Sequence, residues 1–363
     1  MAVYARLDRF VLRLEQRLGR LAPAAVGAAG LALACLWVRT PSEPLGLGTF
    51  YAWLSLDPFE HAAKNPVAFR PLTPWISWAV GLRGNALRFT NLYFAAALLA
   101  CVFAWFRHHA PRPGDALLAT AAICFSFVTL GVVFSPYYCD ALTLLVVFGM
   151  WCARHRPLAF HALFALGLFN RESLLFLVPW FAFVQLAESQ QRGRTLAGQA
   201  AGYGFGLALY AAFRASAAQQ GPVQYDVDYY LGPVLADPLH FFRQSARYQW
   251  AGLYSVFGPA WAIPVAGAVA LWQRGERAAP LGLALLLFSV WAQLWVAIDA
   301  SRLFALAFPV MIVALEELFR TDALRFREWV PWVVLLQALA PPTQAAANRF
   351  WAMDSLWTSL VWR

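Results

Sequence analysis

Apolar and polar positions occur in long blocks along this chain, without the strict alternation expected of amphipathic strands. Apolar runs recur at intervals of about 20 to 40 residues over the whole length, and a helix of about 20 apolar residues spans a bilayer. Arg-bearing or Pro-rich segments separate the runs. This pattern predicts an all-α, polytopic membrane protein in which no sizeable soluble domain is left over.

The apolar runs predict about 11 membrane-spanning helices. In chain order they cover residues 22–38, 86–106, 116–134, 141–153, 157–169, 174–187, 196–213, 251–272, 280–298, 303–315 and 329–340. Several contain only about 12 to 14 residues, so flanking polar residues or a locally thinned bilayer must complete those crossings.

The remaining segments divide the chain into three parts. Residues 1–21 predict a cytoplasmic amphipathic helix, with Arg6, Arg9, Arg13, Arg17 and Arg20 on one face and apolar residues such as Phe10 and Val11 on the other. Residues 22–340 form the transmembrane domain, with long outer loops at 39–85 and 214–250. An interfacial segment is expected at 72–82, and the aromatic-rich stretch 341–363 predicts an interfacial helix on the outer face.

Composition supports the membrane class. The chain is 61% hydrophobic and 13% charged, about half the charged fraction of a soluble domain. The net charge of +9 is explained by arginines in short loops, so no nucleic-acid partner is expected, whereas membrane lipids are. The five cysteines are scattered and the six histidines lack metal-ligand spacing, so we expect neither a disulfide framework nor a metal site or cofactor built on them. Binding of Mg²⁺ or Mn²⁺ by carboxylates alone stays open.

The basic residues also predict an orientation. With the N-terminus in the cytoplasm, the short turns at 107–115, 154–156, 188–194, 273–277 and 316–328 all face inward, and each carries arginine. The less common polar motifs then fall together on the opposite face. They include Asp57, Glu60, His61, Arg70, Tyr137, Tyr138, Asp140, Asn170, Arg171, Glu172, Asp226, Asp228, Asp299 and Arg302.

The first outer loop contains one candidate set. Asp57, Glu60 and His61 share one face of a predicted short helix after Pro58. That face is either a solvated surface or a place where Asp57 acts as a general base, assisted by Glu60 or His61. Arg70 either binds a phosphate or anchors the loop to lipid headgroups.

A second set lies at the ends of the hairpin formed by 141–153 and 157–169. Tyr137, Tyr138 and Asp140 precede it, and Arg171 and Glu172 follow it. A helix-dipole effect on Asp140 and a local Arg171–Glu172 ion pair are the structural interpretations. The functional one is a wet recess in which these side chains bind substrate.

The motif Asp299–Ala–Ser–Arg302 also has two interpretations. The first is an ion pair that links two helices, and the second is an arginine on a phosphate, oriented by Asp299.

These motifs resemble those of the GT-C superfamily of integral-membrane glycosyltransferases. The matching features are the acidic first outer loop, the segment FRPLTPW that ends it, and SPYYCD, FNRES and IDASRLFALAFP. The last three resemble motifs of uncharacterised bacterial members. The resemblance covers most of the chain as architecture but only about 40 residues as motif.

The resemblance implies an enzyme of the bacterial inner membrane whose active site faces away from the cytoplasm. Its donor would be a polyprenyl-phosphate sugar, and an acid in the first outer loop would activate the acceptor hydroxyl. Asp57 matches that acid best, although Glu43 lies nearer the first span. Arg70, Arg171 or Arg302 would stabilise the departing phosphate.

Two other functions stay open at this stage. A transporter or flippase for a lipid-linked solute needs charges along a path that opens to both sides, and the inner halves of the spans carry almost none. A non-catalytic scaffold subunit predicts that the outer acids are separated and exposed.

Overall fold

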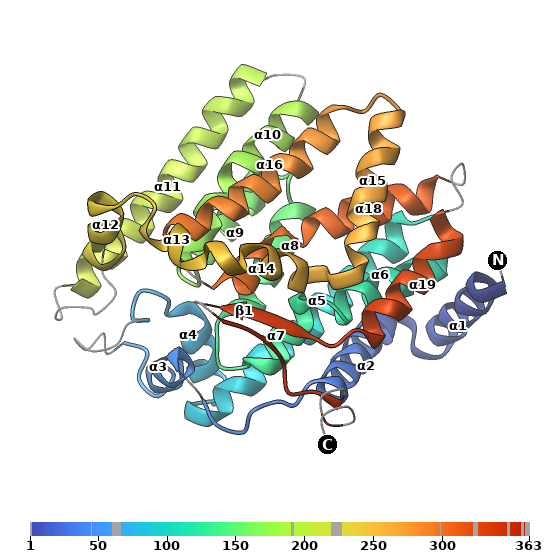
Figure 1. Cartoon of the computed structure of the whole chain (residues 1–363), viewed down its shortest axis with the longest axis horizontal. Helices are drawn as coiled ribbons and strands as arrows, with labels where there is room; N and C mark the ends of the chain where they lie inside the picture. The colour runs from blue at the N-terminus through green and yellow to red at the C-terminus, as the bar shows by residue number, and fades with distance from the viewer. Residues whose placement is uncertain are drawn as a thin grey trace.

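The computed structural model describes residues 2–44, 46–59, 67–189, 192–218, 227–297, 299–321, 326–346, 349–356 and 359. Helices make up about 79% of the structure, which confirms the predicted all-α class. They pack into one bundle, and a short antiparallel hairpin near the C-terminus crosses one side of it (Figure 1).

The helices are mostly short. Those of the N-terminal half are α1 (Ala2–Leu18), α2 (Ala22–Trp37), α3 (Leu47–Leu54), α4 (Leu72–Ala79), α5 (Leu87–His109), α6 (Pro113–Cys124), α7 (Phe127–Phe134), α8 (Asp140–Cys152) and α9 (Pro157–Leu168). Those of the C-terminal half are α10 (Val178–Glu188), α11 (Arg192–Ala218), α12 (Val227–Ala236), α13 (His240–Ser245), α14 (Gln249–Phe257), α15 (Ala262–Gln273), α16 (Ala278–Ala292), α17 (Ala300–Phe304), α18 (Pro309–Arg320) and α19 (Phe326–Leu339). Turns of 3₁₀ helix extend or join them at η1 (Gly19–Leu21), η2 (Gly84–Ala86), η3 (Glu172–Leu177), η4 (Ala246–Tyr248), η5 (Gly258–Trp261), η6 (Gln293–Trp295) and η7 (Ala305–Ala307). The hairpin consists of strands β1 (Thr343–Ala346) and β2 (Arg349–Ala352).

Among the described residues, four helical stretches are long and apolar enough to cross a membrane. They are Tyr4–Trp37, Gly84–His109, His240–Gln273 and Ala278–Trp295. A fifth is obtained if α6 and α7, which meet at 45°, form one bent span. The helices therefore support a membrane protein, whereas the predicted count of 11 spans is not confirmed.

Two predicted spans are not single regular α-helices, although the first remains part of the helical stretch His240–Gln273. Residues 251–272 divide into α14 and α15 at Gly258, whose φ of 50° favours glycine, followed by Pro259. Residues 303–315 divide at η7, and Pro309 begins α18. Proline has no N–H to donate to the preceding turn, so it fits the start of a helix better than its interior.

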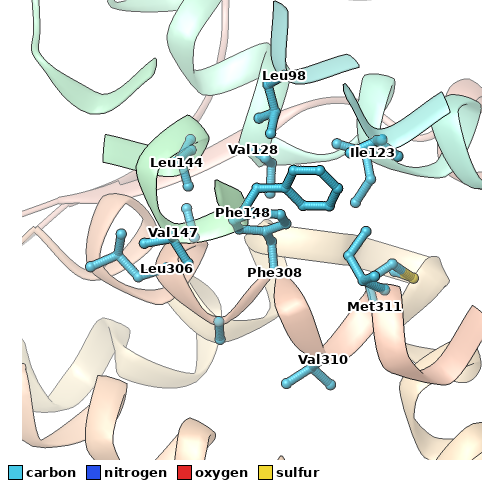
Figure 2. Packing of buried hydrophobic residues seen from close by; sticks show 14 of the residues in the cluster. Leu98, Ile123, Val128, Leu144, Val147, Phe148, Leu306, Phe308, Val310 and Met311 are labelled. Carbon is cyan, nitrogen blue, oxygen red and sulfur yellow. The ribbon is translucent and has the colours of Figure 1, made fainter. Parts of the chain in front are cut away.

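The core lies where α5 to α8 meet η7 and α18. Figure 2 shows Phe148 of α8 at its centre, beside Phe308, and the two ring centroids are 6.4 Å apart. On another side of the bundle, α15 approaches α18 so closely that a Cβ on Gly267 would lie 2.6 Å from the Ala314 Cβ. Such close packing contributes more to helix association in a bilayer than the exclusion of water does.

Helix α1 packs against α6 along one face. Val11 is fully buried, the Asp8 carboxylate accepts a hydrogen bond from the Gly114 N–H at 2.6 Å, and Glu15 pairs with Arg107 at 2.6 Å. Phe10, predicted to lie on the same apolar face as Val11, is exposed. Part of that face therefore meets protein, and the arginine face points away from α6.

The C-terminal segment differs from its prediction. An interfacial helix was expected in residues 341–363, but the chain forms β1 and β2, with Thr343 opposite Ala352. The Ser301 hydroxyl accepts a hydrogen bond from the Ala345 N–H at 2.6 Å, and Arg39 N–H donates to the Asp354 carbonyl at 2.9 Å. These bonds hold the hairpin between α17 and the end of α2, and local helix propensity does not predict such long-range partners.

Candidate functional site

The charged motifs flanking α8 and α9 lie at helix ends. Asp140 is the first residue of α8, where the helix dipole favours a negative charge. Arg171 has extended backbone between α9 and η3. Asp299 directly precedes α17, and Arg302 lies within that helix. The short α8 and α9 thus return Asp140 and Arg171 to the same end of the bundle.

These side chains form two neighbouring ion-pair clusters, which together we call the arginine network: Asp140, Arg171, Asp299 and Arg302 in the first, and Arg70 with Glu172 in the second. Asp140 is the centre of the first cluster, since it contacts Arg171 and also accepts hydrogen bonds from Arg302 at 2.5 and 3.1 Å. Arg302 donates to Asp299 at 3.0 Å. The side chains of Arg171, Arg302 and Asp140 are only 7%, 11% and 14% exposed, so pairing is what makes their burial tolerable.

Glu172, which directly follows Arg171 in the chain, is the centre of the second cluster. Its carboxylate accepts hydrogen bonds from Arg70 at 2.7 Å and from the Tyr210 hydroxyl at 2.8 Å, and Arg214 lies 3.7 Å away. Arg214 also lies 4.0 Å from the Phe69 ring centroid. Arg70 and Arg214 therefore share the Glu172 carboxylate. Asp140 is shared by Arg171 and Arg302.

Asn170 has a structural place beside the network. Its amide donates to the Cys139 carbonyl at 2.7 Å and to the Thr143 hydroxyl at 2.8 Å, and its carbonyl accepts from the Thr73 hydroxyl at 2.6 Å. These bonds tie the end of α9 to the start of α8 and to α4, which positions Arg171 and Glu172.

The two tyrosines lie between the network and the first long loop. The Arg302 guanidinium lies 4.0 Å from the Tyr138 ring centroid, a cation–π contact. The Tyr137 hydroxyl donates to the Ser42 carbonyl at 2.5 Å. Both tyrosines thus connect the start of α8 to the segment after α2.

Little space remains around Asp140. The cavity that Asp140, Arg171 and Arg302 line has a volume of about 10 Å³, which is close to the room needed by a single water. A sugar or a phosphate group cannot enter it in this conformation.

A second, much larger cavity is lined in part by Asp299. It has a volume of about 790 Å³ and lies between residues 39–46, the turn 134–138 and the hairpin β1–β2. We call it the hairpin cavity. Glu43, Tyr137, Tyr138, Asp299 and Gln344 are among the residues that line it.

Two oxygen atoms at this cavity are notable. Asp299 Oδ1 and Gln344 Oε1 are buried and have no hydrogen-bond partner in the described part of the chain. Both atoms are hydrogen-bond acceptors, and leaving such atoms unpaired costs about 1–3 kcal/mol each. Both residues line the cavity, so a small turn of either side chain would present its oxygen to a ligand that brings hydroxyl or amide donors.

Three further charged residues, Glu43, Arg39 and Asp354, line the hairpin cavity. Glu43 is exposed. Arg39 is 3.6 Å from Asp354, but their side chains are 81% and 53% exposed, so the pair is weak. Arg39 directly follows the first apolar run, and the sequence analysis placed it at the start of the first outer loop without singling it out. Gln344 was missed because the hairpin itself was not predicted.

The pKa values of Glu172 and Asp299 are shifted in opposite directions. Burial would raise the pKa of Glu172, but Arg70, a backbone hydrogen bond and the Tyr210 hydroxyl together outweigh it and lower that pKa below 4.5. Burial raises the pKa of Asp299 above 3.8 despite Arg302, and the nearby Asp140 charge adds to the increase. Asp299 is therefore the acid more ready to hold a proton.

The predicted site residues fall into three groups. Arg70, Asp140, Arg171, Glu172, Asp299 and Arg302 form the arginine network, with Tyr138 against it and Tyr137 beside it. Asp57, the predicted base, is exposed; its Oδ1 accepts a hydrogen bond from Phe59 N–H at 3.2 Å, and among the described residues no ion pair joins it to the network. Glu60, His61, Asp226 and the side chain of Asp228 lie outside what the structure describes.

A metal-ion site is not evident: within the described ranges, no three His, Cys, Asp or Glu side chains come together in a suitable arrangement. Comparisons with models of known protein families, with functionally characterised proteins and with solved structures found no match to this chain. The class that helices and composition support is an all-α membrane protein, and its activity must be argued from the cavity alone.

Proposed function

We propose that this protein is a membrane glycosyltransferase of GT-C type, with several further short spans among the shorter helices. It moves a sugar from a polyprenyl-phosphate carrier to an acceptor hydroxyl on the non-cytoplasmic face. The observation that carries this proposal is the hairpin cavity. It is lined by three carboxylates, by Arg39 and by Gln344, and Asp299 and Gln344 each have an acceptor oxygen without a partner among the described residues.

A sugar fits the chemistry of this cavity. Its volume of about 790 Å³ lies in the usual range for small-molecule sites, roughly 300–1,000 Å³. The sugar hydroxyls are donors for Asp299 Oδ1 and Gln344 Oε1. Both atoms are buried in this conformation, so the Asp299 and Gln344 side chains must turn toward the cavity before sugar hydroxyls donate to them, which then relieves the cost of two unpaired acceptors. Trp351 also lines the cavity and offers an apolar ring face to a sugar.

The position of Arg39 suits the carrier phosphate. Arg39 lies two residues after the end of α2, which belongs to a candidate membrane span, and it lines the hairpin cavity. The phosphate of a membrane-bound carrier lies at that same depth. Because its pair with Asp354 is exposed and long, the guanidinium can turn to a phosphate at little cost.

The reaction then needs one base. Glu43 accepts the proton of the acceptor hydroxyl while the hydroxyl oxygen forms a bond to the anomeric carbon. The bond between that carbon and the carrier phosphate oxygen breaks, and the electron pair leaves with the phosphate, beside Arg39. Glu43 replaces Asp57 in this role because Glu43 lines the cavity whereas Asp57 is bonded into an exposed turn.

The arginine network supports this site without touching the substrate. It fixes Asp299 through Arg302 and holds Tyr138 at the cavity wall. Arg70, Arg171 and Arg302, which the family resemblance offers as phosphate ligands, each contact a carboxylate. In the proposed reaction they are therefore positioning residues.

The test is binding and turnover of defined donors. Purified protein in proteoliposomes is supplied with a panel of radiolabelled polyprenyl-phosphate hexoses and pentoses, and release of polyprenyl phosphate is measured with and without candidate acceptors. We expect at least one donor to bind and to be cleaved. Ala346, which lines the cavity, provides the blocking variant Ala346→Trp, which should abolish both.

A matched control is Val269→Trp, which places the same bulk on an exposed position of α15. It should bind and cleave the donor normally. If no lipid-linked sugar binds better than polyprenyl phosphate alone, or if Ala346→Trp binds donor like the wild type, the proposed function is wrong.

A further inference from the structure

A second large cavity lies far along the chain from the hairpin cavity residues, between the ends of α10, α16 and α18. Its volume is about 620 Å³, and we call it the α10–α16 groove. Helices α10 and α16 run side by side in Figure 1. We propose that this groove binds one phosphatidylethanolamine molecule from the bilayer. This inference is independent of the proposed transferase activity.

The inner wall of the groove is apolar. Trp151 and Trp180 stack with ring centroids 5.7 Å apart and planes 9° from parallel. Phe183 and Leu283 also line it, and a Cβ on Gly282 would lie 3.3 Å from the Phe183 ring. Because Gly282 has no side chain, its helix can pack closely against Phe183. The resulting apolar wall accommodates an acyl chain better than a polar solute.

The groove lies at the end of a candidate membrane span. Its lining includes Gly275 to Ala279 and continues to Leu283, while α16, which begins at Ala278, belongs to the span Ala278–Trp295. The mouth is therefore at the level of the turn and the inner wall at the level of the first helical turns. A lipid with its headgroup at the mouth has its chains at the depth of the apolar wall.

Charges of both signs surround the mouth. Arg154 pairs with Glu188 at 3.3 Å and lies 4.0 Å from the Trp151 ring centroid. Arg277 lines the groove and lies 5.7 Å from the Trp272 ring centroid, and within the described residues it makes no ion pair. Glu276, next to it, also lines the groove and pairs with Arg274 at 2.6 Å, and Glu316, Glu317 and Arg320 complete the charged lining.

This pattern favours a zwitterionic headgroup that carries an amine. The Arg277 guanidinium can bind the lipid phosphate. Glu188 and Glu276 each pair with an arginine through one oxygen, and the remaining lone pairs of these carboxylates can accept hydrogen bonds from the primary ammonium. An anionic headgroup without an amine would leave a hydroxyl or a second negative charge next to these carboxylates. Phosphatidylcholine has no N–H to donate to them.

The experiment is a lipid titration of delipidated protein in detergent, followed by native mass spectrometry. The probes are dioleoyl phosphatidylethanolamine, phosphatidylcholine, phosphatidylglycerol and dioleoylglycerol. We expect one phosphatidylethanolamine to bind at least about tenfold more tightly than each of the others. Arg277→Gln should weaken binding about tenfold, and Ala279→Trp, at the groove wall, should abolish it.

The chain offers matched controls for both variants. Arg247 is exposed and lies 5.7 Å from the Tyr248 ring centroid, the same cation–π distance as Arg277, but it does not line the groove. Arg247→Gln and Val269→Trp should bind lipid as the wild type does. Equal binding of all four lipids, or unchanged binding by Arg277→Gln and Ala279→Trp, would overturn the proposal, and neither result bears on donor cleavage in the hairpin cavity.

Discussion

The arginine network and the hairpin cavity meet at Asp299, yet they use charge in opposite ways. In the network, Asp140 is shared by Arg171 and Arg302, and only about 10 Å³ of empty space remains. In the cavity, about 790 Å³ is open, Arg39 is loosely paired, and two acceptor oxygens lack partners among the described residues. A group whose interactions are complete contributes to the fold, and a group with unused capacity can serve a ligand.

This difference changes how the charged motifs are understood. Asp140 and Arg171 draw attention in the sequence because they flank apolar helices, but they satisfy one another. Arg39 and Gln344 draw little attention, and yet they line the space where a ligand fits. Four measurements test this difference between the arginine network and the hairpin cavity, beginning with the largest expected effect.

The first measurement removes the centre of the network. Asp140→Asn leaves two buried guanidinium groups without their shared carboxylate, and breaking a buried pair costs about 3–5 kcal/mol. We expect a loss of that size in the free energy of unfolding, measured by SDS titration in mixed micelles. Asp237→Asn, which breaks the exposed Arg243 pair at 3.0 Å, should cost less than about 1 kcal/mol.

Asp299 provides a second test because it pairs with Arg302 of the arginine network and also lines the hairpin cavity. Asp299→Asn removes only one partner of Arg302, and its side chain is 26% exposed. Its cost should be clearly smaller than that of Asp140→Asn. Equal costs would show that the network extends fully to the cavity wall.

The second measurement concerns the base. Glu43→Gln keeps the shape of the side chain but removes proton acceptance, which contributes roughly 10²–10⁴-fold to a rate. We expect kcat for sugar transfer to fall by at least about a hundredfold with unchanged thermal stability, because Glu43 is exposed. The reverse pattern, in which Asp57→Asn is inactive and Glu43→Gln is active, would place the base in the turn after α3.

The sequence predicts part of this picture for physical reasons. Apolar run length predicts helices well, so α8 (Asp140–Cys152) and α9 (Pro157–Leu168) fall close to the expected 141–153 and 157–169. Their short length also predicts that Asp140 and Arg171 approach one another. The hairpin at Thr343–Ala352 was not predicted, because its partners Ser301 and Arg39 are distant in the sequence.

For the same reason, the cavity residues could not be grouped from the sequence. The residues that line the cavity include Arg39, Glu43, Tyr137, Asp299 and Gln344. They come from segments that are far apart in the sequence, and no periodicity joins them. Only the tertiary fold, through α17 and the hairpin, brings them to one space.

The third measurement uses pH to distinguish the contributions of Glu172 and Asp299 to stability. The pKa of Glu172 is lowered, so its contribution to stability is present above pH 4.5 and is lost as the pH falls below it. The pKa of Asp299 is raised, so its contribution is present below pH 3.8 and is lost as the pH rises through the folded-state pKa. The stability difference between wild type and Glu172→Gln should therefore shrink on acidification.

The same titration should give the opposite trend for Asp299→Asn. Wild type should gain stability relative to this variant as the pH falls, because protonation of Asp299 relieves its burial. Thermal midpoints measured from pH 7 down to the limit of solubility provide both curves. Parallel curves for the two variants would contradict the distinction between a network acid and a cavity acid.

The smallest expected effect tests whether an unpaired oxygen at the cavity meets a substrate. Gln344→Leu removes Oε1, and the loss of one hydrogen bond costs about 1 kcal/mol, or about fivefold in KM for the donor with kcat nearly unchanged. Gln293→Leu is the matched control, since Gln293 is also buried with no partner among the described residues but does not line the hairpin cavity. It should leave KM unchanged. Because both substitutions remove a buried unsatisfied amide, their effects on folding should be similar, so a change in KM confined to Gln344→Leu isolates contact with the donor. A KM unaffected by either variant would mean that the unpaired oxygen is a structural feature, as the paired charges of the arginine network are.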